Sequence, residues 1–242
     1  MAAVVPEEEE SPVMGEVMEE REPAHSEEAE AEESYAEVQR YVVEGVVVEE
    51  GPALTNETLR EWAKRWCAGD REGLPHISGW NTSQVTDFSQ LFYGKSKFND
   101  DIGAWDTSNV TNMMFMFAHA PSFNQPLGGW RVDKVTNMEA MFYYASAFNQ
   151  PLNDWRVDNV TDMQRMFCGA SAFNQPLNDW RVDKVTNMQY MFAYATSFNH
   201  PLGDWQIREG CNTNCMFSGT KFDGCTTENM SGRIESSCCT VS

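Results

Sequence analysis

The sequence has few basic residues and no long apolar run. Its 242 residues hold 17 Lys and Arg against 37 Asp and Glu, for a formal net charge of −20. This balance excludes nucleic acid as an expected partner, since phosphate binding needs a basic face. No apolar stretch approaches the ~20 residues of a membrane span. The N-terminal residues 1–7 have neither the charged region nor the apolar core of a secretory signal. We therefore expect synthesis in the cytosol.

Arrangements that support catalysis or bind metals are also missing. The four histidines are scattered: His25, His76, His119 and His200. They form no nucleophile–base pair, and no glycine-rich phosphate loop is present. Seven irregularly spaced cysteines predict free thiols rather than a disulfide framework. Cys211, Cys215 and Cys225 lack a fourth ligand at standard zinc spacing. We expect no enzyme activity, no metal, no cofactor and no small-molecule substrate.

Negative charge is concentrated at the N-terminal end. Residues 1–53 contain 17 Glu and two basic residues, Arg21 and Arg40, so about −15 of the net charge lies there. High charge with few apolar residues predicts disorder. We assign residues 1–52 to an acidic disordered tail. Within it, residues 26–39 suit a short helix, and residues 41–48 are apolar enough to contact a folded domain.

One large side chain returns at a constant interval of 25 residues. The tryptophans are Trp80, Trp105, Trp130, Trp155, Trp180 and Trp205. Periods of 20–50 residues are typical of solenoids, propellers and arrays. A single copy cannot bury its own apolar face, so neighbouring copies must stack. The repeat therefore predicts a long exposed surface rather than an enclosed reaction pocket.

Each copy contains two local patterns. Alternation around Trp130 and Val132 predicts a short strand with one buried face. Thr136, followed three residues later by Glu139, has the spacing of a helix capping box. Behind it stands an apolar stripe at helical spacing: Met138, Met141, Phe142 and Ala145. We expect one strand and one short helix in every copy.

These patterns predict an α/β repeat solenoid. It is leucine-rich-repeat-like, with one short strand and one short helix per 25-residue coil and a helical N-terminal cap. We place the solenoid at residues 53–225, with the cap helix at 55–67, the repeats at 80–205 and a degenerate closing coil at 206–225. Leu59, Trp62 and Trp66 lie on one side of the cap helix. Residues 226–242 form a flexible C-terminal tail.

Stacking places equivalent residues of successive copies on one another. A phenylalanine column is expected at Phe98, Phe123, Phe148, Phe173 and Phe198. An asparagine column follows it: Asn99, Asn124, Asn149, Asn174 and Asn199. A buried amide needs a hydrogen-bond partner in every coil. We therefore expect these asparagines to bond the backbone of neighbouring coils rather than a ligand.

Two phrases carry a family resemblance. Residues 148–155, FNQPLNDW, and residues 160–167, VTDMQRMF, resemble the 25-residue repeat of the BspA-like leucine-rich-repeat surface proteins of bacteria and protists. The segment from residue 53 to residue 80 is also similar to the one that precedes these arrays. The likeness covers about residues 53–222. It implies a leucine-rich-repeat-type solenoid, a surface location, and adhesion or protein recognition rather than catalysis.

The outward side of the predicted strands carries two columns of charge. The candidate binding residues are Arg131, Asp133, Arg156, Asp158, Arg181 and Asp183. Like charges ~4.8 Å apart repel, so the two columns are expected to compensate each other. Two interpretations stay open. The columns form a solvated lattice worth little per pair, or they form a hydrogen-bonding face that binds a protein partner.

The C-terminus ends in a pattern for lipid attachment. Cys239 heads a C-a-a-X box, in which Val241 is aliphatic and the terminal Ser242 favours farnesyl. One lipid anchors only marginally, but Cys238 could carry palmitate as a second signal. The alternative interpretation is a coincidence in a cysteine-rich tail. Without lipid, these residues carry no function that we can assign.

Together these features predict a non-catalytic protein–protein recognition or adhesion module. It would bind a protein partner, not yet identified, and attach to the inner membrane face through the C-terminal lipid. The alternative is an exported cell-surface adhesin whose targeting signal is missing or unconventional. The two differ in which side of the membrane the repeat surface occupies.

Overall fold

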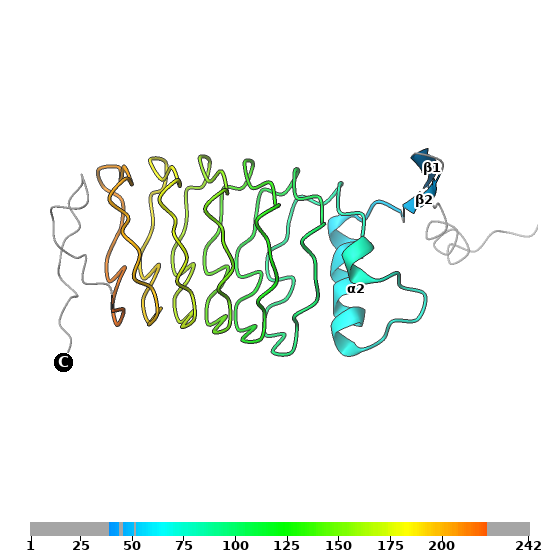
Figure 1. The fold of residues 1–242 in the computed structure, drawn as a ribbon, viewed down its shortest axis with the longest axis horizontal. Helices are drawn as coiled ribbons and strands as arrows, with labels where there is room; N and C mark the ends of the chain where they lie inside the picture. Colours follow the sequence, from blue (N-terminus) through cyan, green and yellow to red (C-terminus); the bar gives the residue numbers. More distant parts are fainter. Residues whose placement is uncertain (1–38, 44–45, 51, 222–242) are drawn as a thin grey trace, which may run out of the picture. The chain divides into compact units, whose positions relative to one another are not determined.

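The computed structural model describes residues 39–43, 46–50 and 52–221 (Figure 1). The helices and strands follow in the order β1 (Gln39–Val43), β2 (Val46–Glu50), α2 (Asn56–Ala68) and the 3-10 helix η1 (Ile77–Gly79). The expectations for residues 1–38 and for the C-terminal tail lie outside the described residues.

Strands β1 and β2 form an antiparallel hairpin within the acidic segment. Val42 pairs with Val47, and Arg40 pairs with Glu49. Valine, which is frequent in the sequences of both strands, favours strand conformation. The segment that we expected to be disordered over residues 1–52 therefore contains a hairpin at its C-terminal end, where valines replace the runs of glutamate.

Helix α2 covers the segment expected to form the cap helix. It begins at Thr55, whose side chain accepts a hydrogen bond from the backbone of Thr58 in a capping box, and it ends at Gly69 in the left-handed conformation (φ 84°). Leu59, Trp62 and Trp66, expected on one side, are all buried. The rings of Trp62 and Trp66 meet Trp80 edge-on, with centroids 5.4 and 5.8 Å away.

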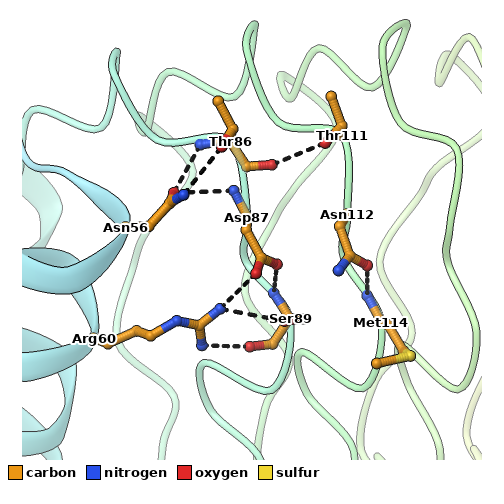
Figure 2. Close-up of polar contacts among 8 residues, drawn as sticks. All are labelled: Asn56, Arg60, Thr86, Asp87, Ser89, Thr111, Asn112 and Met114. Carbon is orange, nitrogen blue, oxygen red and sulfur yellow. Dashed lines mark hydrogen bonds and ion pairs between the residues drawn. The ribbon is translucent and has the colours of Figure 1, made fainter.

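Helix α2 also supplies the polar contacts that the first coil cannot obtain from a preceding coil (Figure 2). The Asn56 side-chain oxygen accepts from the backbone N–H groups of Thr86 and Asp87 at 2.9 and 3.1 Å. The Arg60 guanidinium donates to the Ser89 carbonyl at 2.6 Å and to the Asp87 carboxylate at 2.9 Å. Backbone groups at the open end of the stack are thus satisfied by two side chains of one helix.

After η1 the chain winds into coils that stack side by side (Figure 1). Single parallel bridges join successive coils at Asp87, Asn112, Asn137, Asp162, Asn187 and Asn212. The backbone N–H groups of residues 138, 140, 142 and 144 donate to the carbonyls of residues 162, 164, 166 and 168 at 2.8–2.9 Å. Every second residue of this segment therefore bonds the next coil, as in a parallel ladder.

The predicted helix and strand of each coil are wrong. Among the described residues, α2 is the one α-helix, and no strand is present at residues 130–133. The N–H groups of Met141 and Tyr143 donate to carbonyls three residues earlier, which gives consecutive tight turns. An α-helix needs each N–H to reach the carbonyl four residues back, but alternate N–H groups here already bond the next coil.

The predicted capping box at Thr136 is also wrong. The Thr136 hydroxyl donates to the Thr111 carbonyl of the preceding coil at 3.3 Å. The Asn137 side chain instead accepts from the Glu139 backbone N–H at 2.8 Å. The asparagine thus satisfies the local turn, as such side chains do over two residues, while the threonine links coils. A leucine-rich-repeat-like solenoid with a helical N-terminal cap stays our proposal for the fold class, but turns replace the expected strand and helix of each coil.

The interior is lined by the repeated aromatic rings. All six indoles of the 25-residue series are at most 3 % exposed. Each of the last five donates from its ring N–H to a carbonyl of the preceding coil, as Trp155 does to Leu127 at 3.0 Å. Phe148 stacks on Phe142 of its own coil at 3.9 Å between centroids and on Phe173 of the next at 6.1 Å.

The asparagine column bonds backbone between coils, as expected. The Asn149 side-chain oxygen accepts from the Asn174 backbone N–H at 2.9 Å, and the Asn124 oxygen accepts from Asn149 in the same way. Gln175 adds a side-chain bond to the Asn149 carbonyl at 3.0 Å. The amides therefore belong to the scaffold and leave the outward columns to carry function.

Candidate functional site

The structure brings most of the predicted charged residues together. Arg131 and Asp133 lie 3.7 Å apart. Asp158 lies between two coils and contacts Arg156 at 3.7 Å and Arg181 at 3.5 Å. Asp183 forms no ion pair with any described residue. We call these six residues the Arg/Asp face.

The ion pairs of the Arg/Asp face are long, at 3.5–3.7 Å, and exposed to solvent. The three arginine side chains are 67–80 % exposed. Arg156, Asp158 and Arg181 border an open depression of about 270 Å³. Exposed pairs at this distance contribute little stability. The arginine and aspartate columns thus partly neutralise each other's charge, as expected. Binding of a protein by this face stays a prediction.

A second surface was not predicted from the sequence. Three large hydrophobic side chains are exposed among the described residues: Tyr93 (48 %), Tyr144 (45 %) and Tyr194 (57 %). We call residues 138–144 and their equivalents in the other coils the ladder segment, because they bond the next coil. All three tyrosines lie near the C-terminal end of this segment in their coils. We define the aromatic face by these residues and their neighbours on the same segments: Tyr93, Phe115, His119, Tyr143, Tyr144, Arg165, Tyr190 and Tyr194.

Ring contacts connect the aromatic face across coils. Tyr93 meets His119 edge-on at 5.7 Å, and His119 stacks on Tyr144 at 5.5 Å with an interplanar angle of 4°. Tyr143 packs edge-on against both, at 5.1 Å from His119 and 4.6 Å from Tyr144. Farther along, the Arg165 guanidinium lies 5.5 Å from the Tyr190 ring centroid. The rings of Tyr93, His119, Tyr143 and Tyr144 are therefore held against one another before any partner binds.

The backbone under these rings is in an unfavourable conformation for large side chains. His119, Tyr144 and Tyr194 have φ of 56°, 54° and 58°. Other coils place glycine at the equivalent position, for example Gly94 and Gly169. A non-glycine residue costs about 1–2 kcal/mol there. Gln90 and Ala140 also have positive φ, so this conformation belongs to the coil and the case for these rings rests on their exposure and their contacts.

Two of the exposed tyrosine rings pack against glycines of the following coils. A Cβ on Gly169 would lie 2.8–3.0 Å from ring carbons of Tyr144, and a Cβ on Gly219 would lie 2.7 Å from a ring carbon of Tyr194. The signal for this face is present in the sequence as positions where the copies differ. An analysis of the residues that all copies share does not reveal the aromatic face.

Burial raises the pKa of one group in the aromatic face, Tyr143, and of one group near its Arg165, Glu139. Burial, followed by the negative charge of Asp162, raises the pKa of the Glu139 carboxyl, and Arg165 acts against this rise. Burial and then the neighbouring Tyr144 raise the pKa of the Tyr143 hydroxyl. Tyrosine rings with one arginine and few charges are typical of the centres of protein interfaces.

The cysteines differ partly from expectation. Cys67, Cys168 and Cys211 are free, and burial raises the pKa of each thiol, which reduces its reactivity. Cys215 is disulfide-bonded, so the prediction of free thiols is wrong at this position. Cys238 and Cys239, the predicted lipid sites, lie outside the described residues. Within the described ranges, no three metal-binding side chains gather, and no helix has the length and apolarity to cross a membrane.

Comparison with known proteins gives one match. The family model described as "Mycoplasma protein of unknown function, DUF285" matches residues 67–167 and, a second time, residues 130–229. The two matches overlap because the model fits the repeats in two positions along the stack. No curated protein and no solved structure matches the chain.

Proposed function

This chain belongs to the DUF285 family, and from its geometry we propose that it is a non-catalytic recognition module that binds a protein partner through the aromatic face. The observation that carries the proposal is that the exposed large hydrophobic residues of the described chain lie at two adjacent positions of the repeat, Tyr144 and Tyr194 at one and Tyr93 at the position just before it. Exposed apolar patches of this kind mark interaction surfaces. The resemblance to BspA-like repeats supports the same class of function.

The aromatic face is the better candidate of the two surfaces. Interface energy concentrates in buried Tyr, Trp and Arg side chains, and the ring contacts around His119 hold several of these groups in place. The Arg/Asp face would have to order arginine side chains that are up to 80 % exposed, at a cost in side-chain entropy. We assign the Arg/Asp face a supporting role at the rim of the interface.

Capture of partner proteins by matched variants tests the proposal. Y93S/Y144S/Y194S removes the exposed rings, and R131E/R156E/R181E reverses the charge of the other face. Because each interface tyrosine contributes about 1–2 kcal/mol, captured protein measured by quantitative mass spectrometry should fall at least about tenfold for the tyrosine variant and remain for the arginine variant. The reverse pattern would move the site to the Arg/Asp face, and undiminished capture by both variants would exclude both faces.

We further propose attachment to the inner membrane face through farnesyl on Cys239 and palmitate on Cys238. The support is the terminal sequence itself, in which an aliphatic residue and a final serine follow Cys239. Intact mass of the natural protein should show both lipids. A C239S variant should leave the membrane fraction. If that variant fractionates with membranes as the parent does, lipid is not the anchor.

The alternative function is an exported cell-surface adhesin. The resemblance to BspA-like surface proteins supports it, because that family's members lie at the cell surface. Protease treatment of intact cells separates the two locations. Digestion of the repeat region would favour the adhesin, whereas full protection would favour the inner membrane face.

A further inference from the structure

The exposed tyrosines of the aromatic face recur in alternate coils. Tyr144 and Tyr194 are 50 residues apart, which is two coils, and Tyr93 lies two coils before Tyr143, the neighbour of Tyr144. The coil between Tyr144 and Tyr194 has Gly169 at the equivalent position. Both rings lie over the glycine of the following coil, so their separation stays at two coils. The face therefore presents one exposed tyrosine for every two coils.

Successive coils are closest together on the side of the aromatic face. Equivalent rings are 6.1 Å apart at Phe148 and Phe173, outside the ladder segment, and 5.5 Å apart at Phe142 and Phe167, within it. The hydrogen-bonded backbone of a ladder has a spacing of ~4.8 Å. The ladder side of the stack is therefore concave, and concave faces are the binding surfaces of such arrays.

The interval between exposed tyrosines matches one kind of partner backbone. Two coils correspond to ~9.6 Å at the ladder, which is an upper value for rings on its concave side. A segment in polyproline II conformation repeats every three residues, over ~9.3 Å. An α-helix returns to the same face after seven residues, over ~10.5 Å, and a strand after two residues, over ~6.7 Å. Of the three, the polyproline II repeat fits the interval.

A basic depression borders the Tyr93 end of the aromatic face. It has a volume of about 290 Å³, and its charged lining residues are all basic: Arg60, Lys64 and Lys95. Arg60 is already bonded to the first coil, and Lys64 contacts Glu61 at 3.7 Å. Lys95 forms no ion pair with any described residue. This end of the face is therefore complementary to an acidic residue of a partner.

We propose that the aromatic face binds a proline-rich segment of the partner in polyproline II conformation, which rests on the protein-binding function proposed above. Prolines three residues apart pack on Tyr93, Tyr144 and Tyr194, and an acidic residue beyond the proline on Tyr93 contacts Lys95. Proline-rich segments suit aromatic-lined surfaces because they are extended before binding and lose little entropy. Their backbone carbonyls have no internal partner, so the tyrosine hydroxyls can donate to them.

Titration of labelled peptides into the full-length protein, followed by fluorescence anisotropy, tests the proposal. The probe consists of Pro-Ala-Ala triplets that end in a pair of glutamates. A second probe carries the glutamates at its other end, since a row of rings does not set the direction of the bound chain. The register control has proline at every fourth residue and the same glutamates. It should bind at least about fivefold more weakly than the better triplet probe, because its prolines miss successive tyrosines.

Three variants assign the binding to named side chains. Y144G/Y194G removes two rings and leaves the residue that other coils have at this position, so the backbone conformation is kept. It should weaken the better triplet probe at least about tenfold. K95Q should weaken it about threefold by removing one exposed ion pair. The matched control R156E, on the Arg/Asp face, should change the affinity by less than about twofold.

Equal binding of the register control would overturn the proposal, as would binding that survives Y144G/Y194G. An amphipathic helical peptide that binds better than either triplet probe would assign the face to a helix instead. Unchanged affinity in K95Q would contradict the acidic end of the ligand. If no probe binds while loss of the tyrosines abolishes partner capture, this inference fails and the proposed function stands. If capture is also independent of the tyrosines, the proposed function fails with it.

Discussion

Two residues in each ladder segment have positive φ, whichever side chain stands there. The first position holds Gln90, Phe115, Ala140, Arg165, Tyr190 and Cys215. The second holds Gly94, His119, Tyr144, Gly169, Tyr194 and Gly219. The conformation is thus imposed by the bonds between coils rather than by glycine. At Gly169 and Gly219 a ring of the preceding coil occupies the space that a Cβ would need, whereas a Cβ on Gly94 would meet nothing within 4 Å.

Replacing Gly169 by alanine tests this relation. The change adds backbone strain at φ +74° and a Cβ within 3.0 Å of the Tyr144 ring. The matched control is G210A, because Gly210 has a similar φ of +78° and an added Cβ there would meet no atom within 4 Å. We expect G210A to lower the free energy of unfolding by about 1 kcal/mol and G169A by about 2 kcal/mol, measured by urea denaturation.

The ring contact is isolated by a double-mutant cycle. In a Y144A background, the excess cost of G169A over G210A should disappear, since no ring remains for the Cβ to meet. An unchanged excess would mean that Tyr144 does not rest on Gly169.

The Glu139 carboxylate predicts a pH-dependent stability. Its pKa in the folded protein is raised above the ordinary 4.5, first by burial. Its contribution to stability is therefore full below pH 4.5 and is lost as pH rises through the folded value. E139Q should be more stable than the parent at pH 7, by less than about 1 kcal/mol, and equal to it below pH 4. A difference that does not vary with pH would contradict this assignment.

At the scale of elements, burial was easier to predict than conformation. The apolar positions Met138, Met141, Phe142 and Ala145 are all fully buried, as their spacing indicated. The same spacing wrongly indicated a helix, because consecutive turns also bring residues three and four apart to one side. The choice between a helix and consecutive turns depends on which carbonyls accept from alternate N–H groups. Here those carbonyls belong to the neighbouring coil.

Helix α2 was predictable because its signals are local. Thr55 caps its start and Gly69 its end, and both signals can be read without knowing what the helix packs against. Its use of Asn56 and Arg60 to replace a missing coil (Figure 2) could not be read from the sequence. Those contacts join residues about 30 positions apart.

Loss of Arg60 should loosen the end of the stack. R60Q removes donors to the Ser89 carbonyl and the Asp87 carboxylate, and we expect a loss of about 1–3 kcal/mol because hydrogen bonds of charged groups are the strong ones. Amide exchange of residues 86–98 should accelerate first, since end coils of such arrays depend on one neighbour.

The control for this prediction is K64Q. Lys64 is 77 % exposed and contacts Glu61 at 3.7 Å, so its loss should change stability by less than about 0.5 kcal/mol. Equal effects of the two variants would show that the Arg60 contacts do not hold the cap in place.

At the scale of the whole molecule, one backbone repeat presents different surfaces. Columns that copies share, such as the indoles and the asparagines, form the interior and the links between coils. Columns in which copies differ, such as the one from Gly94 to Gly219, form the aromatic face. The shared columns could be predicted by counting, whereas the outward ones required knowing which residues share a ladder.

The most direct measurement is of scalar couplings across hydrogen bonds by NMR on deuterated full-length protein. The ladder predicts couplings from the amide nitrogens of Met138, Ala140 and Phe142 to the carbonyl carbons of residues 162, 164 and 166. Couplings to the carbonyl carbons of residues 134, 136 and 138 instead would show a helix in each coil. That result would contradict the ladder and the aromatic face built on it.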